Sequence, residues 1–125
     1  MITIENWMST PVYTVNPDDS TLSAIKVMVK KNIGDVVVIN AKNVPIGIIT
    51  ERDILSRVIL SNKSLEETKV KSIMTKNLKT ATVGATFLEI SRLMERGGFR
   101  RIPITKNGKI VGIVTSRDLV RFMSL

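Results

Sequence analysis

An internal repeat constrains the fold of this chain more than any other feature. A Met-Ser/Thr pair, a threonine and a methionine all recur 66 residues later: Met8-Ser9-Thr10 as Met74-Thr75-Lys76, Thr14 as Thr80, and Met28 as Met94. A longer segment, residues 46–54, recurs as residues 111–119 at a spacing of 65, so one residue has been lost in between. The loss falls between residues 40 and 46, where a turn is expected, and surface turns tolerate deletions. The sequence therefore predicts two copies of one folding unit.

Each copy has the pattern strand, helix, strand, strand, helix. The first copy has predicted strands at 12–15, 36–39 and 46–50 and helices at 20–32 and 52–60, whereas the second has strands at 78–82, 102–105 and 110–115 and helices at 86–96 and 117–122. Leu22, Ile25, Val29 and Ile33 have helical spacing and are predicted to form the buried face of the first helix. Gly34 is predicted to end this helix, and Gly97-Gly98 its counterpart. The repeated methionines are predicted to fill the core.

The predicted organisation is one module of mixed α/β (α+β) class. The first copy spans residues 7–60, a polar linker 61–71, and the second copy 72–124. A unit of fewer than about 70 residues has a marginal core, so the two β-α-β-β-α copies are expected to pack against each other with pseudo-twofold symmetry.

Composition excludes several classes of function. The 125-residue chain contains no histidine and no cysteine, which excludes triad hydrolases, cysteine enzymes and most zinc sites. No pair of carboxylates has a spacing that suggests acid–base catalysis, and no phosphate-binding loop of the Gly-x-x-x-x-Gly-Lys-Ser/Thr type occurs. We therefore expect neither an enzyme nor a metal site. The absence of a long apolar run or a signal-peptide pattern predicts a cytoplasmic protein without membrane contact.

The net charge of +8 favours an anionic partner, such as a nucleotide, a nucleic acid or an acidic protein surface. Aromatic residues make up only 4% of the chain, which is few for the stacking platforms of single-stranded nucleic-acid binders. A solvated basic surface without a specific partner is the alternative interpretation of the same charge.

Each copy resembles a cystathionine-β-synthase-type (CBS) domain. The resemblance rests on the Met-Ser/Thr opening, a helix that ends at glycine, Arg100-Arg101-Ile102-Pro103-Ile104, and two occurrences of Gly-x-x-Thr-x-Arg-Asp beginning at Gly47 and Gly112. The resemblance implies two motifs packed through their sheets, with two clefts for adenosine-containing ligands such as AMP, ADP, ATP, NAD or S-adenosylmethionine. It also implies a regulatory role, such as energy sensing, a homodimer, and output through a separate effector protein. The nucleotide would be a regulatory ligand, since no cofactor is required.

The two Thr-x-Arg-Asp segments are the candidate ligand sites: Thr50, Arg52 and Asp53, and Thr115, Arg117 and Asp118. Each segment lies where a strand enters a helix, and a helix N-terminus suits a phosphate. The threonine and arginine can bind phosphate oxygens, and the aspartate can accept hydrogen bonds from ribose hydroxyls. The resemblance assigns the matching positions the same roles. The alternative is a capping box, in which threonine and aspartate cap each other's backbone, and both interpretations can hold for a ligand-free protein.

The resemblance supplies the opposite wall of each cleft from the other copy. The preferred cleft joins Thr50, Arg52 and Asp53 to Thr80, Arg100, Arg101 and Ile102, and the second cleft joins Thr115, Arg117 and Asp118 to Thr14, Gly34, Asp35 and Val36. Asp35 aligns with Arg101, so its carboxylate would repel a phosphate in the second cleft by about 1–4 kcal/mol at 4 Å. Two other functions remain open: a basic nucleic-acid-binding module and a ligand-free dimerisation or assembly module.

Overall fold

The computed structural model describes residues 3–124 and divides the chain into two compact units. The first unit is Tyr13–Asn77. The second unit consists of the described parts of Met1–Val12 and Leu78–Leu125. The described residues include no helix with the length and apolar character needed to cross a membrane.

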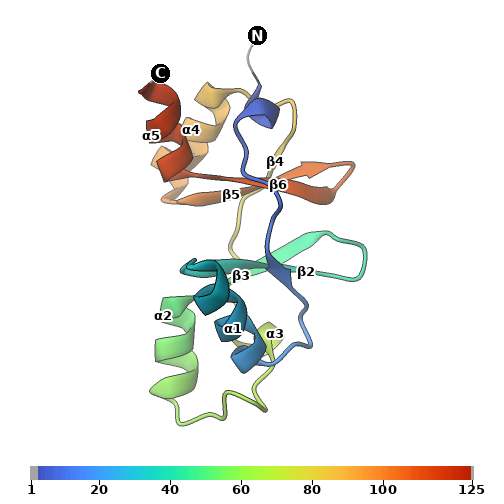
Figure 1. Ribbon diagram of the computed structural model, residues 1–125, viewed down its shortest axis with the longest axis vertical. Coiled ribbons are helices and arrows are strands. Elements are labelled where there is room, and N and C mark those ends of the chain that lie inside the picture. The colour runs from blue at the N-terminus through green and yellow to red at the C-terminus, as the bar shows by residue number, and fades with distance from the viewer. Residues whose placement is uncertain (1–2, 125) are drawn as a thin grey trace. The chain divides into compact units, whose positions relative to one another are not determined.

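The first unit contains a three-stranded sheet covered by helices (Figure 1). Its elements are β1 (Thr14–Val15), α1 (Thr21–Lys31), β2 (Asp35–Ile39), β3 (Pro45–Thr50), α2 (Glu51–Ile54), a π-helical turn η2 (Leu55–Ile59) and α3 (Val70–Ile73). The strand order is β1-β2-β3, with β1 parallel and β3 antiparallel to β2. The parallel step from β1 to β2 is made through α1, as parallel neighbours require a crossover.

The second unit repeats this topology. Its elements are a 3-10 turn η1 (Ile4–Asn6), β4 (Ala81–Thr82), α4 (Phe87–Gly97), β5 (Arg101–Lys106), β6 (Lys109–Thr115) and α5 (Ser116–Met123). The order β4-β5-β6 has the same parallel and antiparallel pairings as the first sheet. The predicted β-α-β-β-α arrangement and the mixed α/β class are therefore confirmed in both copies.

The predicted buried face of α1 is wrong in part. Val29 is 75% exposed, and the fully buried positions of the helix are Thr21, Ala24 and Met28. These positions also have helical spacing, and the buried stripe includes a threonine because its hydroxyl donates to the backbone oxygen of Thr68 at 2.9 Å. The spacing of apolar residues alone therefore could not predict that Thr21 is buried.

Two helix ends also differ from the prediction. Helix α1 ends at Lys31 and is capped by Asn32, which adopts the left-handed conformation with φ of 53°, and not by Gly34. The second helix of the first copy was predicted as one continuous helix over 52–60, but α2 gives way after four residues to η2. In the second copy, Gly98 caps α4 at φ of 68°, as predicted.

The segment between the copies packs against the first unit. The backbone N–H of Val70 donates to Asp19 at 2.8 Å, and that of Thr21 donates to Thr68 at 2.8 Å. Lys71 and Lys69 form ion pairs with Asp18, with N–O distances of 3.0 and 3.6 Å. The hydrogen bond and charge of Lys71, with a smaller contribution from Lys69, lower the pKa of Asp18 below its usual value of 3.8. The short helix α3 ends this segment and was not predicted.

The opening segment of each copy belongs to the unit that holds the other copy's sheet. Ser9 exchanges backbone hydrogen bonds of 2.8 and 3.2 Å with Ile113 in β6, and Thr75 exchanges bonds of 2.8 and 2.9 Å with Ile48 in β3. The adjacent methionines pack on the strand glycines: a Cβ on Gly47 would lie 2.7 Å from the sulfur of Met74. In the second unit, a Cβ on Gly112 would overlap the sulfur of Met8 in the same way. All four repeated methionines pack in or against a core, as predicted.

Candidate functional site

The first Thr-x-Arg-Asp segment forms the junction between β3 and α2. The backbone N–H of Asp53 donates to the Thr50 hydroxyl at 3.1 Å, and the backbone N–H of Thr50 donates to the Asp53 carboxylate at 3.0 Å. This reciprocal pair is a complete capping box. The Asp53 residue is only 6% exposed, so its carboxylate is held among protein groups and not in bulk water. Arg52 lies exposed in the first turn of the helix.

The second segment forms the same box between β6 and α5. The corresponding distances are 3.2 Å from Asp118 N to the Thr115 hydroxyl and 2.8 Å from Thr115 N to the Asp118 carboxylate. Asp118 is 5% exposed, and Arg117 is exposed beside it. The capping alternative is therefore confirmed at both junctions. It leaves the ligand-binding interpretation as a prediction, because a cap can exchange partners when a ligand binds.

The two buried aspartates have different neighbours. Both carboxylate oxygens of Asp53 accept the Thr75 hydroxyl, at 3.0 and 3.2 Å, and Arg57 approaches to 3.7 Å. Asp118 instead accepts a hydrogen bond of 2.5 Å from the exposed guanidinium of Arg121. Ser9 is the repeat counterpart of Thr75, but its hydroxyl makes no such bond within the described part of the chain.

A pocket of about 430 Å³ opens beside Asp118 in the second unit. It is lined by Asp118 and Arg121 from α5 and by Asn6, Trp7, Met8, Ser9 and Thr10 from the N-terminal segment. Trp7 packs edge-on against Phe122, with ring centroids 4.2 Å apart, and its buried indole nitrogen has no hydrogen-bond partner among residues 3–124. Asp118 is therefore almost fully buried, but its side chain borders this pocket beside Arg121.

Within each unit, the start of the central strand lies beside that unit's own threonine. Asp35 is in register with Thr50 and Arg101 with Thr115. The preceding residues accept bonds from the helix starts: Gly34 from the Glu51 N–H and Arg100 from the Ser116 N–H, both at 3.0 Å. The combinations found within a unit are therefore Asp35 with Thr50 and Arg101 with Thr115, and the predicted clefts that combine the two copies remain predictions.

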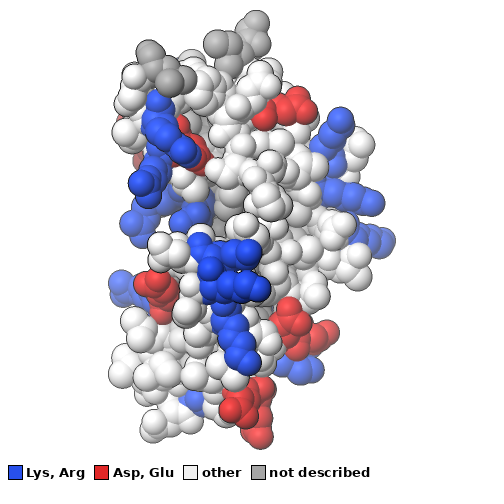
Figure 2. Space-filling model, in the orientation of Figure 1, with Lys and Arg blue, Asp and Glu red and all other residues white. Residues whose placement is uncertain are grey.

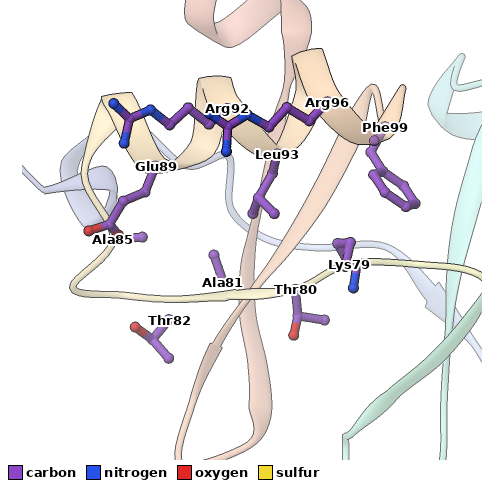
Figure 3. Close-up of a pocket in the computed structure, with 11 residues that line it drawn as sticks. Lys79, Thr80, Ala81, Thr82, Ala85, Glu89, Arg92, Leu93, Arg96 and Phe99 are labelled. Carbon is purple, nitrogen blue, oxygen red and sulfur yellow. The ribbon is translucent and has the colours of Figure 1, made fainter.

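The other predicted wall residues differ in accessibility. Val36 and Ile102 are 2% and 0% exposed and belong to the two cores, so only their backbone groups could meet a ligand. Thr14 begins β1 and is half-buried, whereas Thr80 is exposed just before β4. Thr80 lines a pocket of about 570 Å³ between α4 and β4, shown in Figure 3. Sequence analysis missed the α4 side of this pocket, which includes Arg92 and Arg96.

Charge is distributed over much of the surface. Lys and Arg side chains occur in several groups on the face shown in Figure 2, with acidic side chains between some of them. Among residues 3–124, no group of three or more acidic side chains gathers closely enough to hold a metal ion.

The repeat, the two equivalent sheets and the paired Thr-x-Arg-Asp junctions agree with a family comparison. The model of the CBS domain matches the chain twice, at residues 4–60 and 70–125. The chain belongs to the CBS domain family. Its fold is that of known CBS pairs: a crystal structure of the CBS domain NE2398 superimposes with a TM-score of 0.85 at 28% identity, covering 99% of this chain and 98% of that one.

Two further proteins resemble this CBS pair over most of its length. An uncharacterized 17.7 kDa protein of Acidianus ambivalens is 41% identical over 114 residues, which are 90% of this chain and 68% of that protein. The CBS domain pair of MJ0100, solved in complex with 5-methylthioadenosine and S-adenosyl-L-methionine, has a TM-score of 0.84 at 26% identity, covering 99% of this chain and 97% of that one. The chain spans only 31% to 57% of the length of four other curated relatives.

Proposed function

We propose that this CBS pair is a regulatory module that binds an adenosine-containing ligand and, when the ligand is bound, changes its interaction with a partner protein. The observation that carries the proposal is the solved CBS pair of MJ0100, which shares the fold and was crystallised with two adenosine-containing ligands. The class of ligand is adenosine-based, with AMP, ADP, ATP, NAD and S-adenosylmethionine as the candidates. Regulation, and not catalysis, is the proposed role.

The buried aspartates supply the chemistry for the ribose. A carboxylate that accepts two hydrogen bonds from vicinal hydroxyls is the usual device for holding this sugar. In the structure, Asp53 and Asp118 accept hydrogen bonds from their capping partners and from Thr75 or Arg121, respectively. Binding would replace some of these bonds with bonds to ribose. The helix start and its local conformation would therefore respond to occupancy, which is what a sensor requires.

Charge favours the site that includes Asp53. The residues predicted for the preferred cleft include Arg52, Arg100 and Arg101, whereas those predicted for the second cleft include Asp35, whose carboxylate would repel a phosphate. The exposed Thr80 also borders the 570 Å³ pocket, which is large enough to accept an adenine ring. A ribose that binds Asp53 would have to displace the hydroxyl of Thr75 from this carboxylate, and the cost of breaking these bonds reduces the preference for the Asp53 site.

A thermal-shift screen with the five candidate ligands tests the proposal. A ligand at 100 times its dissociation constant should stabilise the folded chain by about 2.7 kcal/mol, which is a large shift for a chain of this size. Calorimetry on Asp53→Ala and Asp118→Ala then assigns the sites, and we expect Asp53→Ala to lose the tighter one. If no adenosine ligand shifts the melting temperature of the unmodified chain, the sensor proposal is wrong.

Exposed apolar side chains of the first unit favour a second role in self-assembly. Val29, Leu55, Ile59 and Leu60 of the first unit are 48% to 81% exposed and lie on α1 and the α2–η2 segment. Val29 and Leu55 line the same pocket, and we propose that this part of the first unit pairs with a second copy of the chain, because water contact with exposed apolar side chains is unfavourable. Light scattering should show a dimer that Leu60→Glu dissociates and that Lys63→Glu, a change of charge nearby, leaves intact. A monomer before mutation would refute this role.

A further inference from the structure

The helical segment that follows β3 differs from its counterpart in the second unit. Helix α5 is continuous over Ser116–Met123, whereas α2 gives way after four residues to the π-helical turn η2. A π-helical turn is rare and often lies at a functional site. At the repeat spacing of 65, Arg57 in this turn corresponds to Phe122 in α5. A charged side chain therefore replaces a ring in the segment where the two helices diverge.

Arg57 connects η2 to the end of α3. Its Nη1 atom donates to the backbone oxygens of Ile73 and Met74, at 3.1 and 3.3 Å. Ile73 is the last residue of α3 and Met74 is its C-cap, so these oxygens lie where a helix has no internal donors left. An arginine side chain can satisfy such carbonyls. Arg57 thus caps α3 from a different helical segment.

The same guanidinium approaches Asp53, the candidate ribose-binding carboxylate. The Nε atom of Arg57 lies 3.7 Å from Oδ1 of Asp53. Thr75, which follows directly after the C-cap of α3, donates its hydroxyl to both oxygens of this carboxylate, at 3.0 and 3.2 Å. The buried carboxylate therefore holds residues 73–75 by two routes, directly through Thr75 and indirectly through Arg57.

The opening segment of the first copy is held to the second unit in another way. Phe122 stacks on Phe87, with ring centroids 4.7 Å apart, and meets the Trp7 ring edge-on at 4.2 Å. Asp118 bonds instead to Arg121 on its own helix. Of the two candidate carboxylates, only Asp53 is therefore tied to an opening segment by side-chain bonds in the part of the chain that the structure describes.

Residues 73–75 lie close to the point where the chain leaves the first unit. That unit ends at Asn77, and the second unit continues from Leu78. Backbone hydrogen bonds of 2.8 and 2.9 Å pair Thr75 with Ile48 in β3, so the segment is anchored to the sheet as well as to the carboxylate. A change in how firmly residues 73–75 are held therefore reaches the second copy through the covalent chain.

We propose that Arg57 is a positioning residue that couples Asp53 to residues 73–75, so that a vicinal diol bound to Asp53 releases this segment. The diol takes the acceptor positions that Thr75 uses in the structure, and the carboxylate then no longer orients the guanidinium. The inference rests on the proposed function and deepens it, because it names the segment that responds when the Asp53 site is filled. A ligand that must displace these bonds binds less tightly than one that need not.

Hydrogen exchange of the full chain with adenosine tests the coupling, because adenosine carries the ribose diol without a phosphate. We expect saturating adenosine to speed exchange of the Thr75 and Ile48 amides about tenfold, since their backbone bonds lose the support of the bonds to Asp53. The amides of Ser9 and Ile113 pair in the same way in the second unit and are the internal control. Their exchange should not become faster.

Substitution of Arg57 separates coupling from simple stabilisation. Its side chain is 51% exposed, so Arg57→Gln leaves the core intact. This variant should speed exchange at Thr75 without ligand, abolish most of the further rise with adenosine, and tighten adenosine binding in calorimetry about fivefold. Arg57→Lys, which keeps the charge and a donor, should reverse part of each effect. Lys63→Gln removes the same charge from an exposed position and should behave like the unmodified chain.

The outcomes distinguish this inference from the sensor proposal. If adenosine binds the unmodified chain without faster exchange at Thr75 and Ile48, the inference is wrong and the sensor proposal stands. If Arg57→Gln leaves both the adenosine affinity and the adenosine-induced rise unchanged, Arg57 only stabilises α3, and the inference is wrong again. Binding of AMP without binding of adenosine would also overturn it, because the phosphate and not the diol would then hold the ligand. If neither binds, both proposals are wrong.

Discussion

Replacing Thr75 with valine should destabilise the first unit and tighten ligand binding at Asp53. The Thr75 hydroxyl donates to both oxygens of this buried carboxylate, at 3.0 and 3.2 Å. Valine preserves the shape of the side chain and removes the donor. The folded chain then loses a bond to a charged group, while the carboxylate gains free acceptor positions for the ribose of a ligand.

The size of the stability effect follows from the remaining partners of Asp53. A hydrogen bond to a charged group contributes about 1.5–3 kcal/mol. The carboxylate keeps the Thr50 N–H at 3.0 Å, and Arg57 stays 3.7 Å away with a half-exposed side chain whose charge is screened by water. We therefore expect a loss near the lower end of that range, roughly 1.5–2 kcal/mol. A ligand that no longer displaces Thr75 should gain about 1 kcal/mol, or roughly fivefold in affinity.

Urea unfolding followed by far-ultraviolet circular dichroism measures the first effect, and calorimetry with AMP measures the second. Ser9→Ala is the matched control, because Ser9 occupies the position of Thr75 in the second unit. Its hydroxyl forms no hydrogen bond with Asp118 in the described part of the chain. We expect this substitution to change the free energy of unfolding by less than about 0.5 kcal/mol.

Two results would refute the reasoning. Equal destabilisation by Thr75→Val and Ser9→Ala would show that the hydroxyl bonds to Asp53 contribute nothing specific. Weaker AMP binding in Thr75→Val, with folding intact, would show that Thr75 itself contacts the ligand and does not compete with it. Either result would remove the argument that the ligand exchanges with an internal donor.

Three further predictions concern other parts of the chain. Gly112→Ala should cost about 1–3 kcal/mol in urea unfolding, because its Cβ would overlap the Met8 sulfur, and adding Met8→Ala should recover part of the loss. Trp7, the only tryptophan, lines the pocket beside Asp118, so a ligand in that pocket should change the tryptophan fluorescence, and an unchanged spectrum at saturation would place the ligand elsewhere. Two lysines lower the pKa of Asp18, so this carboxylate contributes stability that is present above pH 3.8 and lost as the pH falls through the lowered pKa. NMR titration of Asp18 should find a midpoint below 3.8. A midpoint at or above 3.8 would contradict the ion pairs with Lys69 and Lys71.

Local signals in the sequence predicted the order of strands and long helices in both copies and several of the helix caps. The strand-to-helix junctions were recognised because a capping box is encoded by two residues three positions apart, and both boxes form. The left-handed end of α4 at Gly98 follows from an equally local rule. Because the two copies align, an element predicted in one copy could also be predicted at the matching residues of the other.

Longer-range features could not be predicted from such rules. Which face of α1 is buried depends on where Thr68 returns to meet Thr21, a contact 47 residues apart in the chain. The exchange of opening segments depends in the same way on the path of the whole chain. One signal was available: a glycine inside each buried strand, Gly47 and Gly112, often marks the close approach of another segment, and the repeated methionines supply that segment.

The two capping boxes also limit what their repetition can mean for function. Because each box satisfies the backbone at a helix start, both copies would keep Thr and Asp for stability even if only one copy bound a ligand. Identity between the copies at these positions therefore does not discriminate between one site and two. Differences do: Thr75 against Ser9 changes what Asp53 and Asp118 must release, and Lys31 against Gly97 changes the space beside the first strand. The residues at which the copies have diverged are thus the more informative guide to where this CBS pair binds its ligand.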